Sequence, residues 1–237
     1  MLAQARERPD EFPSMVDLLH GDTLNERLWY GTAIKQAHSN LDYVSCWYSF
    51  ERLERGMEYC WALGDVSDDI RYRLARAVLS AHVQTTYARV FIDAPPRMTA
   101  GFMNGFCAST HLFVPMVVDR VSAIAVGTFA RRYGELVPKV NPLLKFSGII
   151  GTMTSRRHLT NDAEPAANAA ESYVRATLRT NDNYFIRNAL LEHTPKISYS
   201  AEAGIPYLQQ PATRPMFEAI ADEIERRAPP REGGSER

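Results

Sequence analysis

The chain has 237 residues, of which 45% are hydrophobic and 23% are charged, so it is a folded protein and not an intrinsically disordered one. Its 27 lysines and arginines nearly balance its 28 aspartates and glutamates. Three widely spaced cysteines without a C-x-x-C pair indicate free thiols and a reducing compartment. This length suits one large domain or two small lobes.

Neither the N-terminal segment nor the most apolar stretch of the sequence indicates export or membrane insertion. The first eight residues are charged and lack the apolar core of a signal peptide. The most apolar stretch, 112–130, contains Asp119 and Arg120, each costing roughly 2.5–3.5 kcal/mol at a bilayer centre. We therefore expect a cytoplasmic or virion location, no secretion and no membrane partner.

Helical periodicity dominates the first half of the chain. Apolar residues recur every three or four positions from Tyr43 to Trp61, and Gly64 is placed to end that helix. Trp47 and Trp61 lie on this apolar stripe, which predicts that both are core residues. Helices are expected, in chain order, over residues 14–19, 23–38, 42–63, 67–81 and 99–108.

The second half is interpreted in the same way. Residues 116–132 form the most apolar predicted helix, with Pro115 in its first turn. Further helices are expected over residues 143–149, 161–179, 181–193 and 213–227. No alternating apolar run is long enough to predict a sheet. The expected fold is all-α, with roughly eight to ten helices in one or two lobes.

The C-terminal part breaks the helical pattern. Residues 196–211 have no helical period but are rich in apolar side chains, which predicts an arm that crosses its own domain or docks on a neighbouring subunit. The expected division is a helical core at 1–194, an extended arm plus terminal helix at 195–228, and a disordered tail at 229–237. The predicted oligomerisation residues are Ile197, Tyr199, Ile205, Tyr207 and Leu208.

Positive charge is concentrated in one window. Between Arg120 and Asn161 lie seven lysines and arginines against the single acidic residue Glu135, a net charge of +6. Arginine pairs bind phosphate oxygens, and the rings of Tyr133 and Phe146 could stack on bases. The predicted nucleic-acid contacts are Arg131, Arg132, Tyr133, Lys139, Lys145, Arg156, Arg157 and His158. The alternative is a solvated basic surface, or one that docks onto the acidic remainder of the chain.

Two further groups of residues have spacings that also occur at catalytic sites. Residues 65–69, Asp-Val-Ser-Asp-Asp, resemble the aspartate-rich magnesium motif of helical terpene synthases, but no second metal motif accompanies them and helix capping is the favoured interpretation. Cys107 and His111 are four residues apart and could form a nucleophile pair on one helix, or simply pack in the core. No histidine metal spacing and no phosphate-binding glycine loop is present in the 237 residues.

These features together predict a structural RNA-packaging protein, similar in architecture to a viral coat or nucleocapsid subunit. It would bind the backbone of single-stranded RNA in the basic window and assemble through its arm into a homo-oligomer, filament or ribonucleoprotein. We expect no cofactor, no metal and no enzymatic activity. The alternatives are an all-α enzyme with a small-molecule pocket, and a helical protein-interaction scaffold.

Overall fold

The computed structural model describes Met15, Leu19 and residues 34–38, 40–44, 46, 50–65, 68–95, 97–156, 158–194, 207 and 210–230. These residues form two compact units, which meet in the sequence between Ser109 and Thr110. Unit 1 contains the described residues up to Ser109, and unit 2 those that follow. We describe each unit by itself.

Unit 2 is built on a parallel β-sheet with the strand order β3-β4-β5. Its strands and connecting helices alternate along the chain, in two consecutive β-α-β units. They are β3 (His111–Val117), α8 (Arg120–Val140), β4 (Lys145–Thr154), α9 (Glu164–Leu178) and β5 (Phe185–Glu192). The prediction of an all-α fold is therefore wrong, because unit 2 is an α/β structure.

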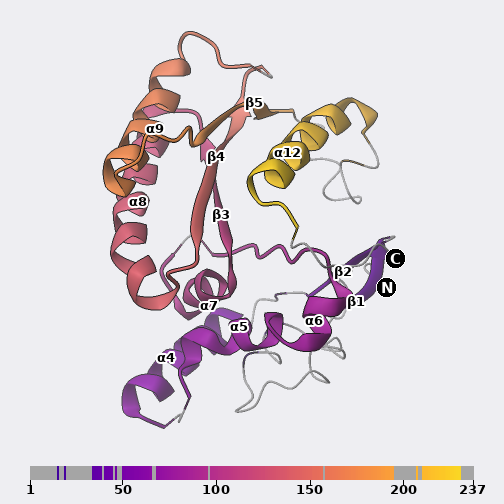
Figure 1. Cartoon of the computed structure of the whole chain (residues 1–237), viewed down its shortest axis with the longest axis vertical. Helices are drawn as coiled ribbons and strands as arrows, with labels where there is room; N and C mark the ends of the chain where they lie inside the picture. The colour runs from indigo at the N-terminus through magenta and orange to yellow at the C-terminus, as the bar shows by residue number, and fades with distance from the viewer. Residues whose placement is uncertain are drawn as a thin grey trace. The chain divides into compact units, whose positions relative to one another are not determined.

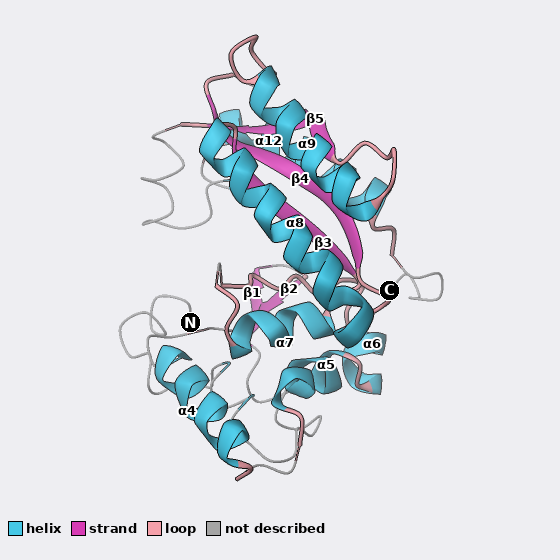
Figure 2. Cartoon of the chain, turned by 90° about the vertical axis from the view of Figure 1, so that its left-hand side faces the viewer, coloured by secondary structure: helices cyan, strands magenta, loops and turns pink. Residues whose placement is uncertain are grey.

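Helices cover both faces of this sheet. The helices α8 and α9 lie side by side on one face, and α12 (Arg214–Arg227), preceded by the short helix η3 (Pro211–Thr213), packs against β5 and β4 on the other (Figures 1 and 2). The centres of β4 and β5 are buried between the layers, with Ile149, Phe185 and Ile186 at most 2% exposed, whereas Met116 is the one buried residue of β3.

Glycines allow the elements of unit 2 to approach closely. A Cβ atom at Gly151 of β4 would lie 2.7 Å from Leu190 Cδ2 and 3.1 Å from Phe185 Cζ. A Cβ at Gly127 of α8 would lie 2.8 Å from Cγ of Tyr173 on α9. Gly148 and Gly151 both lie inside β4, and side chains of the neighbouring elements fill the space that a Cβ would take.

Unit 1 consists of short elements. In chain order they are β1 (Ile34–His38), β2 (Leu41–Tyr43), α4 (Phe50–Leu63), η2 (Ile70–Tyr72), α5 (Arg73–Val78), α6 (Ala81–Thr86) and α7 (Ala100–Ala108). The strands β1 and β2 form an antiparallel pair at a place where a helix was expected. Gly64, with φ +75°, ends α4 as predicted, and Asp65 N donates to Cys60 O across the turn (2.8 Å).

Two buried polar side chains join the elements of unit 1. Asn104 of α7 is 1% exposed; its amide oxygen accepts from Leu74 N (2.9 Å), and its amide nitrogen donates to Ile70 O (2.8 Å). Arg73 is 2% exposed and donates to Leu19 O (2.6 Å) and to both carboxylate oxygens of Asp68. Each buried group is therefore satisfied by partners from another segment.

Several predicted helices are confirmed and others are wrong. The helices at 99–108, 161–179 and 213–227 correspond to α7, α9 and α12. The segments 143–149 and 181–193 instead contain the strands β4 and β5, and the predicted helix 116–132 is divided between β3 and α8. The helices predicted at 14–19 and over most of 23–38 lie outside the described residues. The division at 194/195, the arm and the tail at 229–237 stay predictions.

Candidate functional site

The connection between Val90 and α7 brings a carboxylate to the surface of unit 1. Val90 and Phe91 are 37% and 73% exposed, and Asp93, which follows Ile92, is exposed as well. No cation or hydrogen-bond donor among the described residues contacts the Asp93 carboxylate. The backbone lies against α7 here, because a Cβ at Gly105 would be 3.1 Å from Ile92 Cγ2 and 3.5 Å from Ala94 Cβ.

The other end of this connection is held by α4. Thr99 is the N-cap residue of α7 but makes no side-chain cap; its hydroxyl instead donates to Glu54 Oε1 (2.5 Å). The same oxygen accepts from Gly101 N (2.8 Å), and Glu58 Oε1 accepts from Ala100 N (2.9 Å). Two carboxylates of α4 therefore cap the N-terminus of α7, where negative charge is favourable.

A cysteine lies close to the same carboxylates. Desolvation of the Cys46 thiol raises its pKa to about 11, and the negative charges of Glu54 and Asp93 contribute to the rise. The thiolate is therefore disfavoured at neutral pH, although Cys46 as a residue is exposed. Cys46 is thus a marker of the proximity of Glu54 and Asp93, not a candidate nucleophile.

In unit 2, the carboxyl edge of the sheet gathers polar and strained residues. Met153 has φ +56°, a left-handed conformation that costs a non-glycine residue about 1–3 kcal/mol, and its side chain is 55% exposed. The next residue, Thr154, donates through its hydroxyl to Arg156 O (2.8 Å) and so fixes the start of the following loop. Arg156 and His158 on this loop are exposed. In open α/β sheets this edge is where ligands bind.

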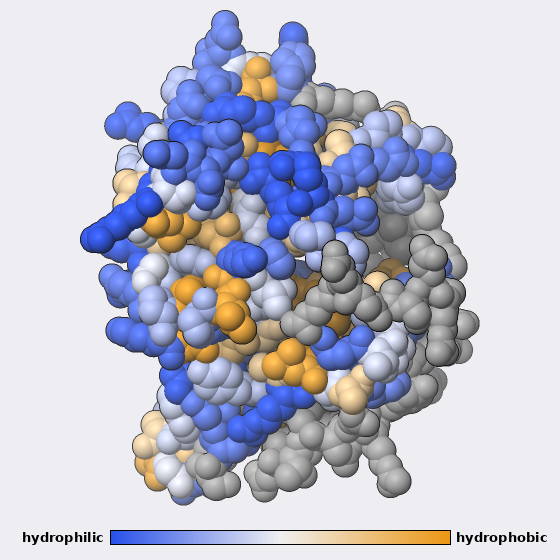
Figure 3. Space-filling view, in the orientation of Figure 1, coloured by the Kyte–Doolittle hydropathy of each residue, from blue (hydrophilic) through white to orange (hydrophobic). Residues whose placement is uncertain are grey.

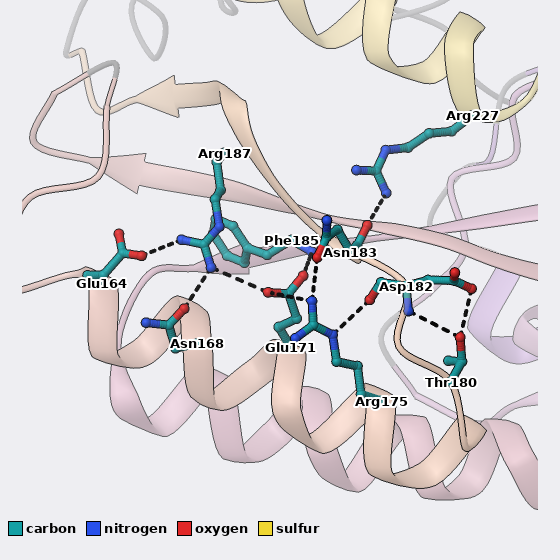
Figure 4. A network of polar contacts seen from close by, with 10 residues as sticks. All are labelled: Glu164, Asn168, Glu171, Arg175, Thr180, Asp182, Asn183, Phe185, Arg187 and Arg227. Carbon is teal, nitrogen blue, oxygen red and sulfur yellow. Dashed lines mark hydrogen bonds and ion pairs between the residues drawn. The ribbon is translucent and has the colours of Figure 1, made fainter.

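A polar network joins α9 to the start of β5 (Figure 4). Its centre is Glu171, 5% exposed, which accepts from Phe185 N (3.0 Å) and from Arg187 (3.3 Å) and lies 3.5 Å from Arg175. Arg187 also donates to Glu164 (2.5 Å) and to Asn168 (2.6 Å). Because its charges are paired and its donors are used, the network fixes β5 on α9 and offers no open ligand position.

A second buried carboxylate attaches α12. Glu223 is 7% exposed and accepts from Asn188 Nδ2 (2.8 Å), Arg226 and Arg227. The hydrogen bond from Arg226 is the largest of the effects that lower its pKa to about 2. Arg227 also donates to the backbone oxygens of Ser147 and Asn183, both at 2.9 Å. This group joins α12 to the sheet and is structural.

The predicted nucleic-acid residues are spread over unit 2. Lys145 and the residues that follow Thr154 lie at opposite ends of β4, a ten-residue strand about 30 Å long. Tyr133 and Phe146 are 5% and 7% exposed, and the Tyr133 hydroxyl donates to Leu144 O (2.6 Å), so neither ring is available for stacking. The exposed members are Arg131, Arg132, Lys139, Lys145, Arg156 and His158, and Arg157 lies outside the described residues.

Of the predicted oligomerisation residues, only Tyr207 is described. Its ring packs edge-on against Phe217 with a centroid separation of 6.3 Å, and its hydroxyl donates to Glu218 (3.1 Å), both on α12. Ile197, Tyr199, Ile205 and Leu208 lie outside the described residues. The assembly role of the segment stays a prediction.

The other singled-out residues have structural roles. Asp69 caps η2 and pairs with Arg71, while Asp68 pairs with Arg73 and Arg76, and these arginines lower the pKa values of both carboxyls. The capping interpretation therefore accounts for them. Burial raises the pKa of Cys107 on α7 to about 11, and His111 begins β3 instead of sharing that helix. Trp61 is 44% exposed, contrary to the predicted core position, and Trp47 lies outside the described residues.

The described residues contain neither a cluster of metal-binding side chains nor a membrane-spanning helix. Within the described ranges, no three His, Cys, Asp or Glu side chains come together as a metal site. No helix in the described part of the chain is long and apolar enough to cross a membrane. On the face shown in Figure 3, apolar areas are small and separated by hydrophilic residues.

Asp93 is the candidate functional residue that the sequence analysis missed. It lies between the predicted helices 67–81 and 99–108, in a segment for which no role was predicted. The available signal was the run Val90-Phe91-Ile92, apolar and suited to a buried strand, ended by a carboxylate. Such a run places an acidic group at the end of an apolar element, where it can meet a ligand.

No protein-family model matches the chain. It is 23% identical over 137 residues to the chromosome partitioning protein ParA of Caulobacter vibrioides, covering 58% of this chain and 48% of that protein. It is 25% identical over 147 residues to the chromosome-partitioning ATPase Soj of Treponema pallidum, covering 61% and 54%. The chain thus spans about half the length of the curated relatives it matches.

Two solved structures resemble the chain over most of its length. Apo McdA of Cyanothece superposes with a TM-score of 0.65 at 15% identity, covering 90% of this chain and 78% of McdA. The ATP complex of a McdA variant gives a TM-score of 0.63, covering 90% and 75%.

These matches contradict the prediction of a coat or nucleocapsid subunit that packages single-stranded RNA and is not an enzyme. The relatives in sequence are a chromosome partitioning protein and a partitioning ATPase, and the similar structures include an ATP complex. A virion location loses its support in the same way. At these levels of identity the structural likeness establishes the fold alone: the chain has the α/β fold of McdA.

Proposed function

We propose that the protein acts in ATP-dependent partitioning, as an ATPase of the ParA type. The observation that carries this proposal is the likeness to McdA, which extends over 90% of the chain and includes an ATP complex. The sequence matches to ParA and Soj, two chromosome-partitioning proteins, add support that is independent of the coordinates. Enzymatic activity and a nucleotide ligand therefore replace the RNA-packaging role.

We assign Asp93 as the residue that contacts the magnesium ion of a bound nucleotide. P-loop enzymes hold Mg²⁺ with an aspartate and a serine or threonine of the phosphate-binding loop, and the remaining ligands are phosphates and water. An exposed carboxylate without a cation or donor partner among the described residues fits this role. A site of this kind needs no cluster of three or more metal-binding side chains, and the described residues contain none.

Unit 2, taken by itself, offers a separate candidate ligand region at the carboxyl edge of its sheet. Ligands of open α/β sheets bind at the carboxyl ends of the strands. Met153 holds a strained backbone conformation there, and strain of this kind is concentrated at ligand sites. Arg156 and His158, exposed on the following loop, are the side chains we expect to face an anionic ligand at this edge.

Bound Mg²⁺ and ATP would supply the phosphoryl chemistry. The phosphate-binding sequence G-x-x-x-x-G-K-[S/T] does not occur in the 237 residues, so its lysine and hydroxyl have no counterpart among them. We therefore derive no hydrolytic step from the described residues. The proposed contribution of unit 1 is to bind the metal through Asp93.

Thermal unfolding in the presence of nucleotide tests the proposal. At an ATP concentration 100 times the Kd, binding stabilises the folded state by about 2.7 kcal/mol, which raises the Tm of a domain of this size by roughly 5–10 °C. We expect this shift with ATP or ADP plus Mg²⁺. A wild-type Tm that is insensitive to both nucleotides would show that the proposed function is wrong.

The variant Asp93→Asn tests the metal assignment separately. It removes the negative charge while keeping the side-chain shape, so the part of the shift that depends on Mg²⁺ should disappear. Asp65→Asn is the matched control, because Asp65 is an exposed aspartate of the same unit outside the 90–99 connection. If the Asp93 variant responds to Mg²⁺ like the wild type, Asp93 is not the metal contact.

A further inference from the structure

The N-terminus of α7 is capped by side chains of another helix, α4. A helix N-terminus leaves four backbone N–H groups without intrahelical partners, and the N-cap side chain normally accepts from one of them. In α7 the N-cap residue Thr99 does not do so. The N–H groups of Ala100 and Gly101 are instead satisfied by Glu58 and Glu54, more than forty residues earlier in the sequence.

Helix α4 is attached to unit 1 mainly through these polar contacts. Only Glu54 and Met57 among its described side chains are buried, each 7% exposed. Its apolar residues Tyr59 and Leu63 point outward, with exposures of 68% and 75%. Among the described side chains of α4, Met57 is the one buried apolar residue, so the tertiary hydrogen bonds of Glu54 and Glu58 contribute to keeping the helix in position.

The segment that these contacts hold is the one that carries Asp93. At its start, Ile92 and Ala94 pack against α7 at Gly105. At its end, Thr99 is bonded to Glu54 on α4. The connection is thus held at both ends, and the second attachment depends on α4 being in place.

We infer that α4 is a strap that fixes the connection carrying Asp93, and that Glu54 and Glu58 are the positioning residues through which it acts. When α4 is docked, the two carboxylates neutralise the N-terminus of α7 and hold Thr99, so the Asp93 backbone has one arrangement. When α4 leaves, the N–H groups of Ala100 and Gly101 lose their partners and the connection loosens. The link to Mg²⁺ binding rests on the proposed function, whereas the strap itself does not.

Hydrogen–deuterium exchange of the full chain tests the strap. The double variant Glu54→Gln/Glu58→Gln removes both negative charges. Each glutamine keeps an amide oxygen that can still accept a hydrogen bond. We expect exchange at Ala100 and Gly101, and over residues 97–103, to become about tenfold faster. Glu51→Gln is the control, because Glu51 is an exposed residue of the same helix and pairs with Arg55 on its surface. Residues 164–178 of unit 2 report whether the protein as a whole is destabilised.

A second variant keeps the test valid if the double variant folds poorly. Thr99→Val removes the hydroxyl that donates to Glu54 and preserves the side-chain shape and both carboxylates. It should accelerate exchange over the same residues by about threefold. Unchanged exchange at Ala100 and Gly101 in both variants, with normal folding, would overturn the inference.

Nucleotide binding separates the strap from the proposed function. If Asp93 contacts Mg²⁺, the double variant should need about tenfold more Mg²⁺ than the wild type or Glu51→Gln to reach the same Tm shift with ATP. Faster exchange combined with no nucleotide response in any variant would retain the strap and reject the ATPase proposal. A nucleotide response with identical Mg²⁺ dependence in all variants would reject the positioning role of Glu54 and Glu58.

Discussion

The two units of this chain keep their elements together by different means. In unit 2, helices cover both faces of a parallel sheet. Gly127, Gly148 and Gly151 allow side chains of neighbouring elements to approach the backbone closely. Unit 1 packs short elements on an apolar cluster that includes Ile70, Leu74 and Val83, and the buried polar groups of Glu54, Arg73 and Asn104 join its segments. The close contacts of unit 2 leave no room for an added methyl group, whereas unit 1 should lose stability when a buried polar group loses its hydrogen-bond partner.

This difference suits the proposed roles of the two units. A sheet with covered faces is a rigid support for loops at its carboxyl edge. A set of short helices joined by directional hydrogen bonds can change its arrangement when one partner is withdrawn. Removing a hydrogen-bond partner from unit 1 and adding a methyl group to the sheet of unit 2 would test this contrast.

The largest effect is expected from Asn104→Ala. The buried amide satisfies Leu74 N and Ile70 O, and its loss leaves both without a partner, which should lower the free energy of unfolding by about 3 kcal/mol. Urea unfolding measures the loss, and hydrogen exchange should locate it in α5 and α7. Thr128→Ala on the exposed face of α8 is the control, expected within about 0.5 kcal/mol of the wild type. Equal exchange increases in both units would contradict a separate role for Asn104 in unit 1.

Gly151→Ala should destabilise unit 2 by about 2 kcal/mol. The new methyl group would lie within 3.1 Å of Leu190 and Phe185, atoms that are themselves packed, so β4 or β5 must shift. Gly56→Ala is the matched control, since no atom lies within 4 Å of its Cβ and the change favours helix by about 0.5–1 kcal/mol. A loss of stability in the Gly56 variant, or none in the Gly151 variant, would show that volume is not what limits unit 2.

The sequence predicts some elements of this contrast and conceals others. Helices with a 3.6-residue apolar period, such as α9 and α12, were located correctly. The sequence of β3, His111–Val117, is a nearly continuous apolar run without alternation, so period alone could not distinguish this strand from a helix. In β5 the pairs Phe185-Ile186 and Ala189-Leu190 are buried and the two residues between them exposed, a helix-like pattern that the bulged register with β4 explains.

The candidate site was hidden for a related reason. The sequence places Asp93 after a short apolar run but gives no sign that Glu54 and Glu58, in a helix far earlier, reach the same connection. Contacts between distant segments depend on tertiary packing, which local patterns do not encode. The charge window, in contrast, was visible in the sequence, yet β4 separates its members by about 30 Å.

Acid should weaken the attachment of α12 in unit 2. The pKa of Glu223 is lowered from 4.5 to about 2 in the folded protein, so its contribution is complete above the unfolded pKa and is lost as the pH falls from about 4.5 to about 2. Because Arg226 is largely exposed, the contribution is about 1–2 kcal/mol. The variant Glu223→Gln should show a shallower loss of stability over this range than Glu225→Gln, which alters an exposed residue of the same helix. Parallel pH profiles for the two variants would reject this attachment.

The smallest effect on stability is expected from the exposed arginines of α8. Arg131→Ala/Arg132→Ala removes one surface ion pair, between Arg132 and Glu135, and should change the free energy of unfolding by less than about 0.5 kcal/mol. If these residues contact nucleic-acid phosphates, as the charge window predicts, the slope of log affinity against log salt for duplex DNA should fall by about 2. Arg55→Ala, an exposed arginine of unit 1, should leave that slope unchanged. An unchanged slope in the α8 variant would mean that unit 2 carries these charges as a solvated surface, and that any contact with nucleic acid lies elsewhere on the chain.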